Sequence, residues 1–315
     1  MGLVIGMDEA GYGPRFGPLV VTATVWEVPD EPRDVDFWKT MDTAITPSPD
    51  RGDRRLHLAD SKQVYSAGKG LAALERTVLA ALQMAGARPG SFRQLCTSLA
   101  PDAVHELNDE PWFDCADLPL PHAPGEDSLD EASDNWSQCC LRGGIRLRAI
   151  RSDVVLTERF NQLTRAFGTK GAALSTISLR LLRSVWNPDD PQPTLVLADK
   201  HGGRNRYDEL LDDVLDGQMI FRRQEGTPLS VYQVKSTELR FQAKGEAHLP
   251  VALASMTCKY VRELAMTLFN QFWNNHVPEL KPTAGYPTDA VRFRSDIAEA
   301  QATLGISNDQ LWRER

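Results

Sequence analysis

The start of the chain carries the feature that most constrains its fold. The apolar run Leu3-Val4-Ile5 leads into the acidic pair Asp8-Glu9, and two glycines and a proline follow within residues 11–14. These turn formers stop regular structure, so the pattern predicts a buried strand with carboxylates at its end. Taken alone, the acidic pair fits a polar turn after an edge strand equally well.

A second apolar run has the same layout. Residues 194–198 are apolar after Thr194, and Asp199 follows directly, before the glycine-containing loop 200–206. Residues 18–26 are rich in β-branched side chains and predict a further strand, antiparallel to the first across the Gly/Pro segment. Two strands of one sheet would bring Asp8 and Asp199 together, in an α/β fold.

Length and composition limit the classes of protein to which the chain can belong. With 315 residues, 42% hydrophobic and 25% charged, the chain can bury a core as one large domain or as a domain with an insertion. The longest apolar runs are shorter than the ~20 residues of a membrane-spanning helix, and Asp8 comes too early for a signal peptide. We therefore expect no membrane association and a cytoplasmic location. The net charge of −8 disfavours general binding to nucleic acid but allows a local basic face.

Periodicity predicts three main helical regions. They are a helix after Asp60-Ser61 that runs to about Leu82, residues 158–186 with a break near Gly168, and a long helix over residues 250–273. Residues 87–141 are rich in proline and acids and read as an insertion. We predict a single domain over residues 1–315, with this insertion, extra β segments at about 216–243 and a helical C-terminal region at about 250–315.

Lys62 stands out in the stretch Asp60-Ser61-Lys62. A cation at a helix start is disfavoured by the helix dipole. An anion such as a phosphate beside that helix start would explain it, and a solvated surface lysine fits the local sequence equally well.

The order of these motifs resembles the type 2 ribonuclease H family (ribonuclease HII/HIII-like). That family runs through Asp-Glu-x-Gly-Arg-Gly-Pro, Asp-Ser-Lys, a strand-end Asp, Lys-Gly-Asp, Ala-Ser-x-x-x-Lys and Gly-Tyr. This chain presents residues 8–14, 60–62, Asp199, 244–246, 254–259 and 285–286 in the same order. The resemblance implies a ribonuclease H-like mixed five-stranded sheet flanked by helices, with an inserted segment and a helical C-terminal region.

The resemblance also implies a metal site. Asp8, Glu9, Asp199 and Glu246 would be the catalytic carboxylates and would hold two Mg²⁺ or Mn²⁺ ions ~3.5–4 Å apart. Neighbouring side chains on a strand face opposite sides, so Asp8 and Glu9 can share one site only if the backbone leaves strand geometry there. The family has Asp where this chain has Glu246, and Glu263 is the alternative fourth ligand.

By the same resemblance, other residues would bind substrate. Gly11, Tyr12 and Gly13 would line the minor groove, Tyr286 would contact the ribose whose 2′-hydroxyl distinguishes RNA from DNA, and Lys62 would hold a phosphate. Tyr12 replaces the family's arginine, which removes a charged contact.

The implied function is a metal-dependent endonuclease that hydrolyses the RNA strand of RNA/DNA hybrids, or cuts at ribonucleotides embedded in duplex DNA. The alternatives are a catalytically weak or inactive nucleic-acid-binding protein on the same fold, and a related nuclease with a different structured substrate. The partner would be nucleic acid, and we expect a monomer. The six histidines show no ligand spacing, and we single out His201, in the loop after Asp199, as the one that could assist catalysis.

Overall fold

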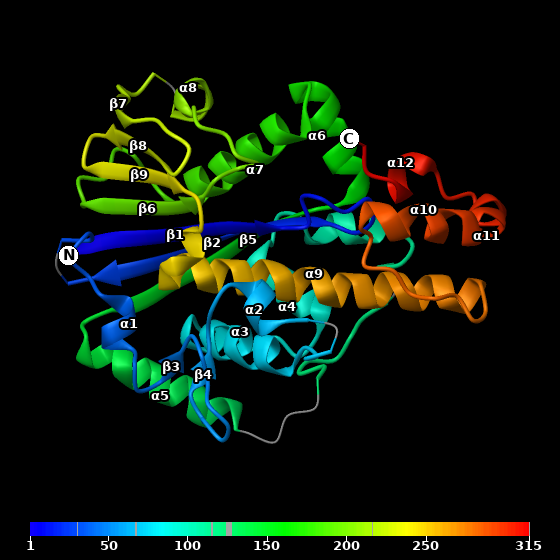
Figure 1. Ribbon diagram of the computed structural model, residues 1–315, viewed down its shortest axis with the longest axis horizontal. Coiled ribbons are helices and arrows are strands. Elements are labelled where there is room, and N and C mark those ends of the chain that lie inside the picture. Colours follow the sequence, from blue (N-terminus) through cyan, green and yellow to red (C-terminus); the bar gives the residue numbers. More distant parts are fainter. Residues whose placement is uncertain (30, 67, 115, 124–127, 216, 315) are drawn as a thin grey trace.

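A mixed sheet forms the centre of the computed structural model, which describes residues 1–315 except 30, 67, 115, 124–127, 216 and 315. Its strand order is β5-β2-β1-β6-β9-β8-β7, with helices on both faces (Figure 1). The predicted mixed α/β sheet flanked by helices is confirmed, but the predicted number of five strands is wrong, because β8 and β7 extend the sheet beyond β9 to a total of seven. The strands are β1 (Gly2–Ala10), β2 (Leu19–Val28), β5 (Arg146–Val155), β6 (Thr194–Asp199), β7 (Phe221–Gln224), β8 (Leu229–Val234) and β9 (Thr237–Gln242).

Strand pairing places two of the predicted site residues at one edge of the sheet. β1 is antiparallel to β2, as predicted, and parallel to β6, with Met7 beside Ala198. β6 is in turn parallel to β9. The carboxyl ends of parallel strands meet at the same edge, where ligands bind in open α/β sheets. Asp8 and Asp199, one residue beyond the Met7–Ala198 pair, therefore lie side by side.

The long helix α9 (Leu249–His276) covers one face of β1 and β2 (Figure 1). It confirms the predicted long helix. Helices α3 (Ala72–Met84), α4 (Phe92–Leu99) and α5 (Leu129–Arg142) contribute to the same core, whereas α6 (Thr157–Phe167), α7 (Lys170–Val185) and α8 (Asp208–Leu215) belong to the opposite face. Along β1, Val4 faces α9, while Leu3, Ile5 and Met7 face α7.

Gly6 allows α9 to lie directly against β1. A Cβ atom added at Gly6 would stand 2.2 Å from the carbonyl carbon of Pro250, in the first turn of α9. The start of α9 is therefore placed by backbone contact with the strand that carries Asp8.

The helix predicted after Asp60 is two helices. α2 (Ser61–Val64) ends at Tyr65, and α3 begins at Ala72. Tyr65 leaves helical geometry with a φ of −110° and a ψ of 133°, and Gly68 and Gly70 follow before α3, with Gly70 at a φ of +73°. The prediction of one continuous helix is wrong for this reason. The predicted break near Gly168, where φ is +76°, is confirmed between α6 and α7.

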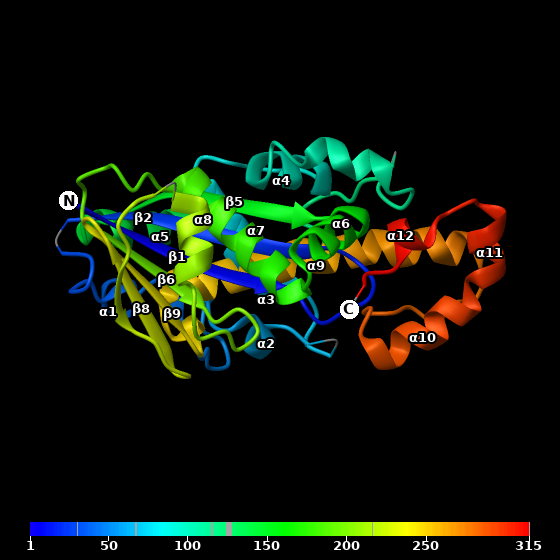
Figure 2. The ribbon, with the colours of Figure 1, turned by 90° about the horizontal axis from the view of Figure 1, so that it is seen from above.

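The segment 87–141 contains α4, the 3₁₀ helix η1 (Val104–Asp109) and α5. Its aromatic side chains Trp112, Phe113 and Trp136 are buried in the α9-side core. The chain ends in α10 (Pro287–Asp296), α11 (Ala298–Thr303) and α12 (Asn308–Leu311), which gather near the C-terminal half of α9 (Figure 2). A small two-stranded sheet joins β3 (Ile45–Thr46) to β4 (Leu56–His57), and α1 spans Phe37–Thr40. Among the described residues, none of the helices is long and apolar enough to cross a membrane.

Candidate metal centre

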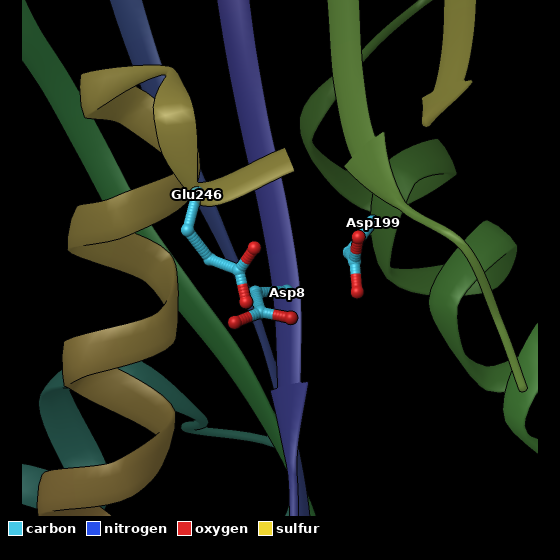
Figure 3. A group of neighbouring side chains, drawn as sticks. All are labelled: Asp8, Asp199 and Glu246. Carbon is cyan, nitrogen blue, oxygen red and sulfur yellow. The ribbon is translucent and has the colours of Figure 1, made fainter. Parts of the chain in front are cut away.

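Three carboxylates converge at the edge where β1 and β6 end. Asp8, Asp199 and Glu246 each place an oxygen within 4.8 Å of the others. Figure 3 shows the Glu246 carboxylate beside that of Asp8, with Asp199 across from them. Asp8 is buried, and the other two are half-buried. Hard carboxylate oxygens in this arrangement fit Mg²⁺ or Mn²⁺.

The turn before α9 delivers Glu246 to this edge. Glu246 lies in the 3₁₀ helix η2 (Gly245–Ala247), and the Gly245 amide donates to Asp199 Oδ1 at 3.2 Å. A Cβ on Gly245 would lie 3.2 Å from the Asp199 nitrogen, so the approach is close. Lys244 enters the turn with a φ of +63°. This left-handed residue reverses the chain from β9 into α9 and points Glu246 at the two aspartates.

Glu9 does not join the group of three. β1 keeps regular pairing through Ala10, with Glu9 opposite Val21, so the departure from strand geometry expected at the acidic pair does not occur. Successive strand residues face opposite sides, and Glu9 lies on the α7 side. Burial and the Asp8 and Asp199 charges nevertheless raise the pKa of Glu9. Glu9 therefore shares the electrostatics of the site, and its role as a ligand stays a prediction.

Burial and mutual repulsion disfavour the charged forms of the clustered carboxyl groups. Burial raises the pKa of Asp8 to about 8, and the Glu246 and Asp199 charges add to this effect, while a hydrogen bond from Ser255 opposes it. Burial, followed by the Asp199 charge, also raises the pKa of Glu246. Bound cations would relieve both penalties.

The raised pKa of Asp8 predicts that the stability of the metal-free protein depends on pH. A carboxyl group whose pKa is raised on folding contributes stability below its ordinary pKa near 4, and this contribution is lost as the pH rises through about 8. In EDTA, we expect the free energy of unfolding to fall from pH 5 to pH 8, and to fall less steeply in Asp8→Asn. Urea titrations at the two pH values measure both slopes. If the free energy of unfolding falls equally with pH in wild type and in Asp8→Asn, Asp8 does not carry the raised pKa.

Lys62 faces the acidic group. Burial lowers its pKa, but the charges of Asp60, Glu246 and Asp8 outweigh burial and raise it overall. The Ser255 hydroxyl of α9 donates to the Ser61 hydroxyl at 3.1 Å, which ties the first residue of α2 to α9 beside the carboxylate group. Lys62 is exposed, so its ammonium group can reach a ligand phosphate there.

Glu263 is engaged elsewhere. Its carboxylate accepts from the Tyr65 hydroxyl at 2.7 Å and from Lys259 Nζ at 2.5 Å, and Arg262 Nη1 lies 3.8 Å away. This neutralised position favours Glu246 over Glu263 as the metal ligand.

The two glutamates are predicted to respond differently to amide substitution. If the three carboxylates form the expected ribonuclease centre, Glu246→Gln should weaken Mg²⁺ binding and lower cleavage of an RNA/DNA hybrid about 100-fold, equivalent to about 2.7 kcal/mol, because one of the three converging charges is lost. Glu263→Gln should leave Mg²⁺ affinity unchanged and reduce only stability. Calorimetric titration with Mg²⁺ compares the two variants. An equal loss of Mg²⁺ affinity in both would support Glu263 as a metal ligand.

The predicted recognition residues occupy different environments. Gly11 has a φ of +93°, and its added Cβ would lie 2.4 Å from the Pro18 oxygen, so a glycine is required. The Tyr12 ring packs toward α7, where Lys170 Nζ lies 4.6 Å from its centroid. Gly13 is exposed, and Tyr286 is 52% exposed at the start of α10.

Two buried arginines hold the loop 11–18 and were not predicted from the sequence. Arg262 donates to the Phe16 and Ala284 oxygens, at 3.1 and 3.0 Å. Arg313 donates to the Gly17 and Tyr12 oxygens, each at 3.2 Å. Together with the bond from the Arg15 amide to the Gly285 oxygen, at 2.6 Å, they join this loop to the turn before Tyr286. The signal for Arg262 was a charge within an apolar stretch of α9.

Arg313→Met should release this loop. The variant leaves the buried Gly17 carbonyl group and the partly buried Tyr12 carbonyl group without their donor, and we expect a loss of about 2 kcal/mol in the free energy of unfolding. Arg88→Met removes an arginine that is 68% exposed and paired at the surface, and it should cost less than about 1 kcal/mol. Urea unfolding measures both. Similar losses would show that the Arg313 contacts contribute little.

His201 is a core residue. Its Nδ1 lies 3.2 Å from the Ser175 hydroxyl, and its ring packs edge-on against Tyr207 and Phe241. Burial lowers its pKa to about 3. The imidazole is therefore neutral near pH 7 and sits outside the carboxylate group.

Comparisons with known proteins find similarity only among solved structures. No family model matches the chain, and no curated protein matches it. The chain is similar to RNase HII of Archaeoglobus fulgidus in its complex with PCNA (14% identity, 99% of this chain and 94% of that chain, TM-score 0.45). It is similar to ribonuclease H2 from Pyrococcus horikoshii OT3 (13%, 98% and 92%, 0.42). It is also similar to Bst-RNase HIII in complex with Mn²⁺ (16%, 99% and 65%, 0.41), so the chain spans slightly less than two thirds of that protein.

Proposed function

We propose that this chain is a metal-dependent endonuclease of the type 2 ribonuclease H kind, which cuts the RNA strand of RNA/DNA hybrids or cuts at ribonucleotides embedded in duplex DNA. The observation that carries the proposal is the convergence of Asp8, Asp199 and Glu246 at the carboxyl edge of parallel strands. The order of the sequence motifs supports the ribonuclease assignment. The protein would act as a single-domain monomer in the cytoplasm.

The three carboxylates, with Glu9 as a predicted fourth, would hold the Mg²⁺ or Mn²⁺ ions. Two such ions supply an activated water and stabilise the leaving oxygen during phosphodiester hydrolysis. Ser255, which donates to the Ser61 hydroxyl, also interacts with the Asp8 carboxyl group and lowers its pKa. Lys62 would hold a substrate phosphate beside it.

The ribose would be recognised by the loop 11–18 and the neighbouring turn. Gly11 and Gly13 carry no side chain of their own, and Tyr286, which is 52% exposed, follows Gly285, whose carbonyl group accepts from the Arg15 amide of this loop. A 2′-hydroxyl at this position would separate RNA from DNA. Tyr12 packs toward Lys170 and would contribute no positive charge.

The test is cleavage with Mg²⁺ or Mn²⁺ of an RNA/DNA hybrid, a DNA duplex with a single ribonucleotide, and plain duplex DNA. We expect cleavage of the hybrid, the single-ribonucleotide duplex or both, and none of plain DNA. Cleavage of plain DNA at the same rate would contradict recognition of the 2′-hydroxyl. If no substrate is cut and Asp8→Asn binds all three no differently, the enzyme proposal fails.

A second candidate is a catalytically weak nucleic-acid-binding protein on the same fold. The placement of the Tyr12 ring on Lys170 favours it, because a charged contact of the related enzymes is replaced. Fluorescence anisotropy in EDTA measures binding of the hybrid, and the cleavage assay measures its hydrolysis. Tight binding in EDTA without cleavage in Mg²⁺ or Mn²⁺ would support the binding protein over the nuclease.

A further inference from the structure

A cavity of about 550 Å³ opens beside Glu246, outside the group of carboxylates. Its lining includes Trp38, Asp60, Gln63, Lys244, Glu246 and Ala247. We call it the Trp38 pocket. Glu246 belongs both to this pocket and to the metal centre, so a molecule in the pocket would continue directly from a phosphate bound at the metals.

The aromatic wall of the pocket is held in place. Trp38, in α1, donates its indole Nε1 hydrogen to the Ala247 oxygen at 2.8 Å. Ala247 follows Glu246 in η2. The hydrogen bond therefore fixes the ring relative to the candidate ligand, while the half-buried ring still lines the pocket.

The polar groups of the pocket are available to a ligand. Lys244 and Gln63 are exposed, and in the described part of the chain neither side chain makes a hydrogen bond or ion pair. Lys244 is one of three non-glycine residues with positive φ among those described, so the backbone is held in a less common conformation beside Glu246. The Asp60 carboxylate is occupied by the Lys62 amide at 3.0 Å. An anionic group would therefore sit at the Lys244 end of the pocket.

We propose that the Trp38 pocket binds one unpaired nucleotide of the substrate strand next to the cleaved phosphate. The base would stack on Trp38, the Gln63 amide would bond its edge, and Lys244 would hold its phosphate. The volume suits a ligand of this size, and aromatic rings bind unpaired bases without regard to sequence. A base inside a regular duplex is paired and stacked on its neighbours, so it cannot enter.

This inference rests on the proposed function and narrows its substrate. The site would favour a hybrid that carries a bulged or overhanging nucleotide beside the cleavage point over a fully paired hybrid. Specificity would then depend on the unpaired nucleotide beside the cleavage point as well as on the ribose.

The test uses full-length protein with Asp8→Asn, so that probes stay intact, and fluorescence anisotropy with two hybrids that differ by one bulged ribonucleotide. We expect the bulged hybrid to bind about tenfold tighter, within the range for one base stacked on an aromatic ring. In the same background, Trp38→Leu should erase this difference. Trp38→Phe should keep most of it, because Phe retains a ring and loses only the hydrogen bond to Ala247.

Lys244 has a matched control. Lys244→Asn removes the charge with a residue that tolerates positive φ, and it should weaken binding of the bulged hybrid more than that of the paired one. Lys235→Asn makes the same change at a φ of +50° in the turn between β8 and β9, and it should change neither affinity.

Three results would overturn the inference: equal affinity for the two hybrids, a preference that survives Trp38→Leu, or a preference lost equally in Trp38→Phe and Trp38→Leu. The proposed function is tested separately by cleavage of paired substrates with wild-type protein. Cleavage together with equal affinities would reject the pocket and keep the nuclease. Absence of binding to both hybrids together with absence of cleavage by wild-type protein would reject both the pocket and the nuclease.

Discussion

Asp8→Asn should lower the rate of cleavage of the RNA/DNA hybrid roughly 10³-fold, equivalent to about 4 kcal/mol of transition-state stabilisation. Asp8 is the buried member of the three carboxylates and adjoins both others. The amide keeps the shape of the side chain but removes the charge that a divalent ion requires. Initial rates on the RNA/DNA hybrid, measured over a range of Mg²⁺ concentrations, give the size of the loss.

The control for Asp8→Asn is Asp34→Asn. Asp34 is exposed and lies outside the carboxylate group, so its variant should retain the wild-type rate. Unfolding midpoints in EDTA show whether Asp8→Asn is folded, and we expect a midpoint at or above that of wild type, since one of the mutually repelling charges is gone. A folded Asp8→Asn protein with more than a tenth of the wild-type rate would show that these carboxylates do not form the active site.

Gly6→Ala should destabilise the fold by about 3 kcal/mol or more. The added methyl group would overlap the backbone of Pro250 at 2.2 Å. Overpacking commonly costs about 1–3 kcal/mol, and here the obstacle is backbone that no side-chain rotation can move. α9 must shift away from β1, and Glu246 and Ser255 move with it. We therefore expect weaker Mg²⁺ binding as well as lower stability.

Gly68→Ala is the matched control for Gly6→Ala. An added Cβ at Gly68 meets no atom within 4 Å, and its φ is not in the left-handed region. Its unfolding midpoint in urea should stay within experimental error of wild type. If Gly6→Ala unfolds at the wild-type midpoint, the close contact between β1 and α9 is not the determinant of their packing.

The elements around the candidate metal centre were predictable because their signals are local. Apolar runs that end in Asp8 and Asp199 gave the adjacent strands β1 and β6, and helical spacing gave α9. The strand β7 lies within the predicted extra β segments at about 216–243, but its residues Phe221–Gln224 are all exposed, and no local pattern showed that it joins the main sheet. Its membership of the sheet depends on pairing with β8.

Other features depend on contacts that no local pattern contains. The glycines after Glu9 marked a turn correctly but did not show that β1 stays regular to Ala10, which decides the face that Glu9 occupies. Arg262 and Arg313 are both only 1% exposed, and the contacts that bury them were not predicted from the sequence. They are buried because carbonyl groups of the loop 11–18, distant in sequence, need donors.

The parallel pairing of β1 with β6 also bears on how the chain folds. These strands lie at opposite ends of the first two hundred residues, so their pairing closes a long loop, and such contacts are slow to form. The Asp8–Asp199 pair does not exist before that step. Divalent ions would then bind the native protein far better than the unfolded chain and stabilise it by mass action. The resistance of the protein to unfolding would thus depend on the supply of the same ions that its proposed chemistry requires.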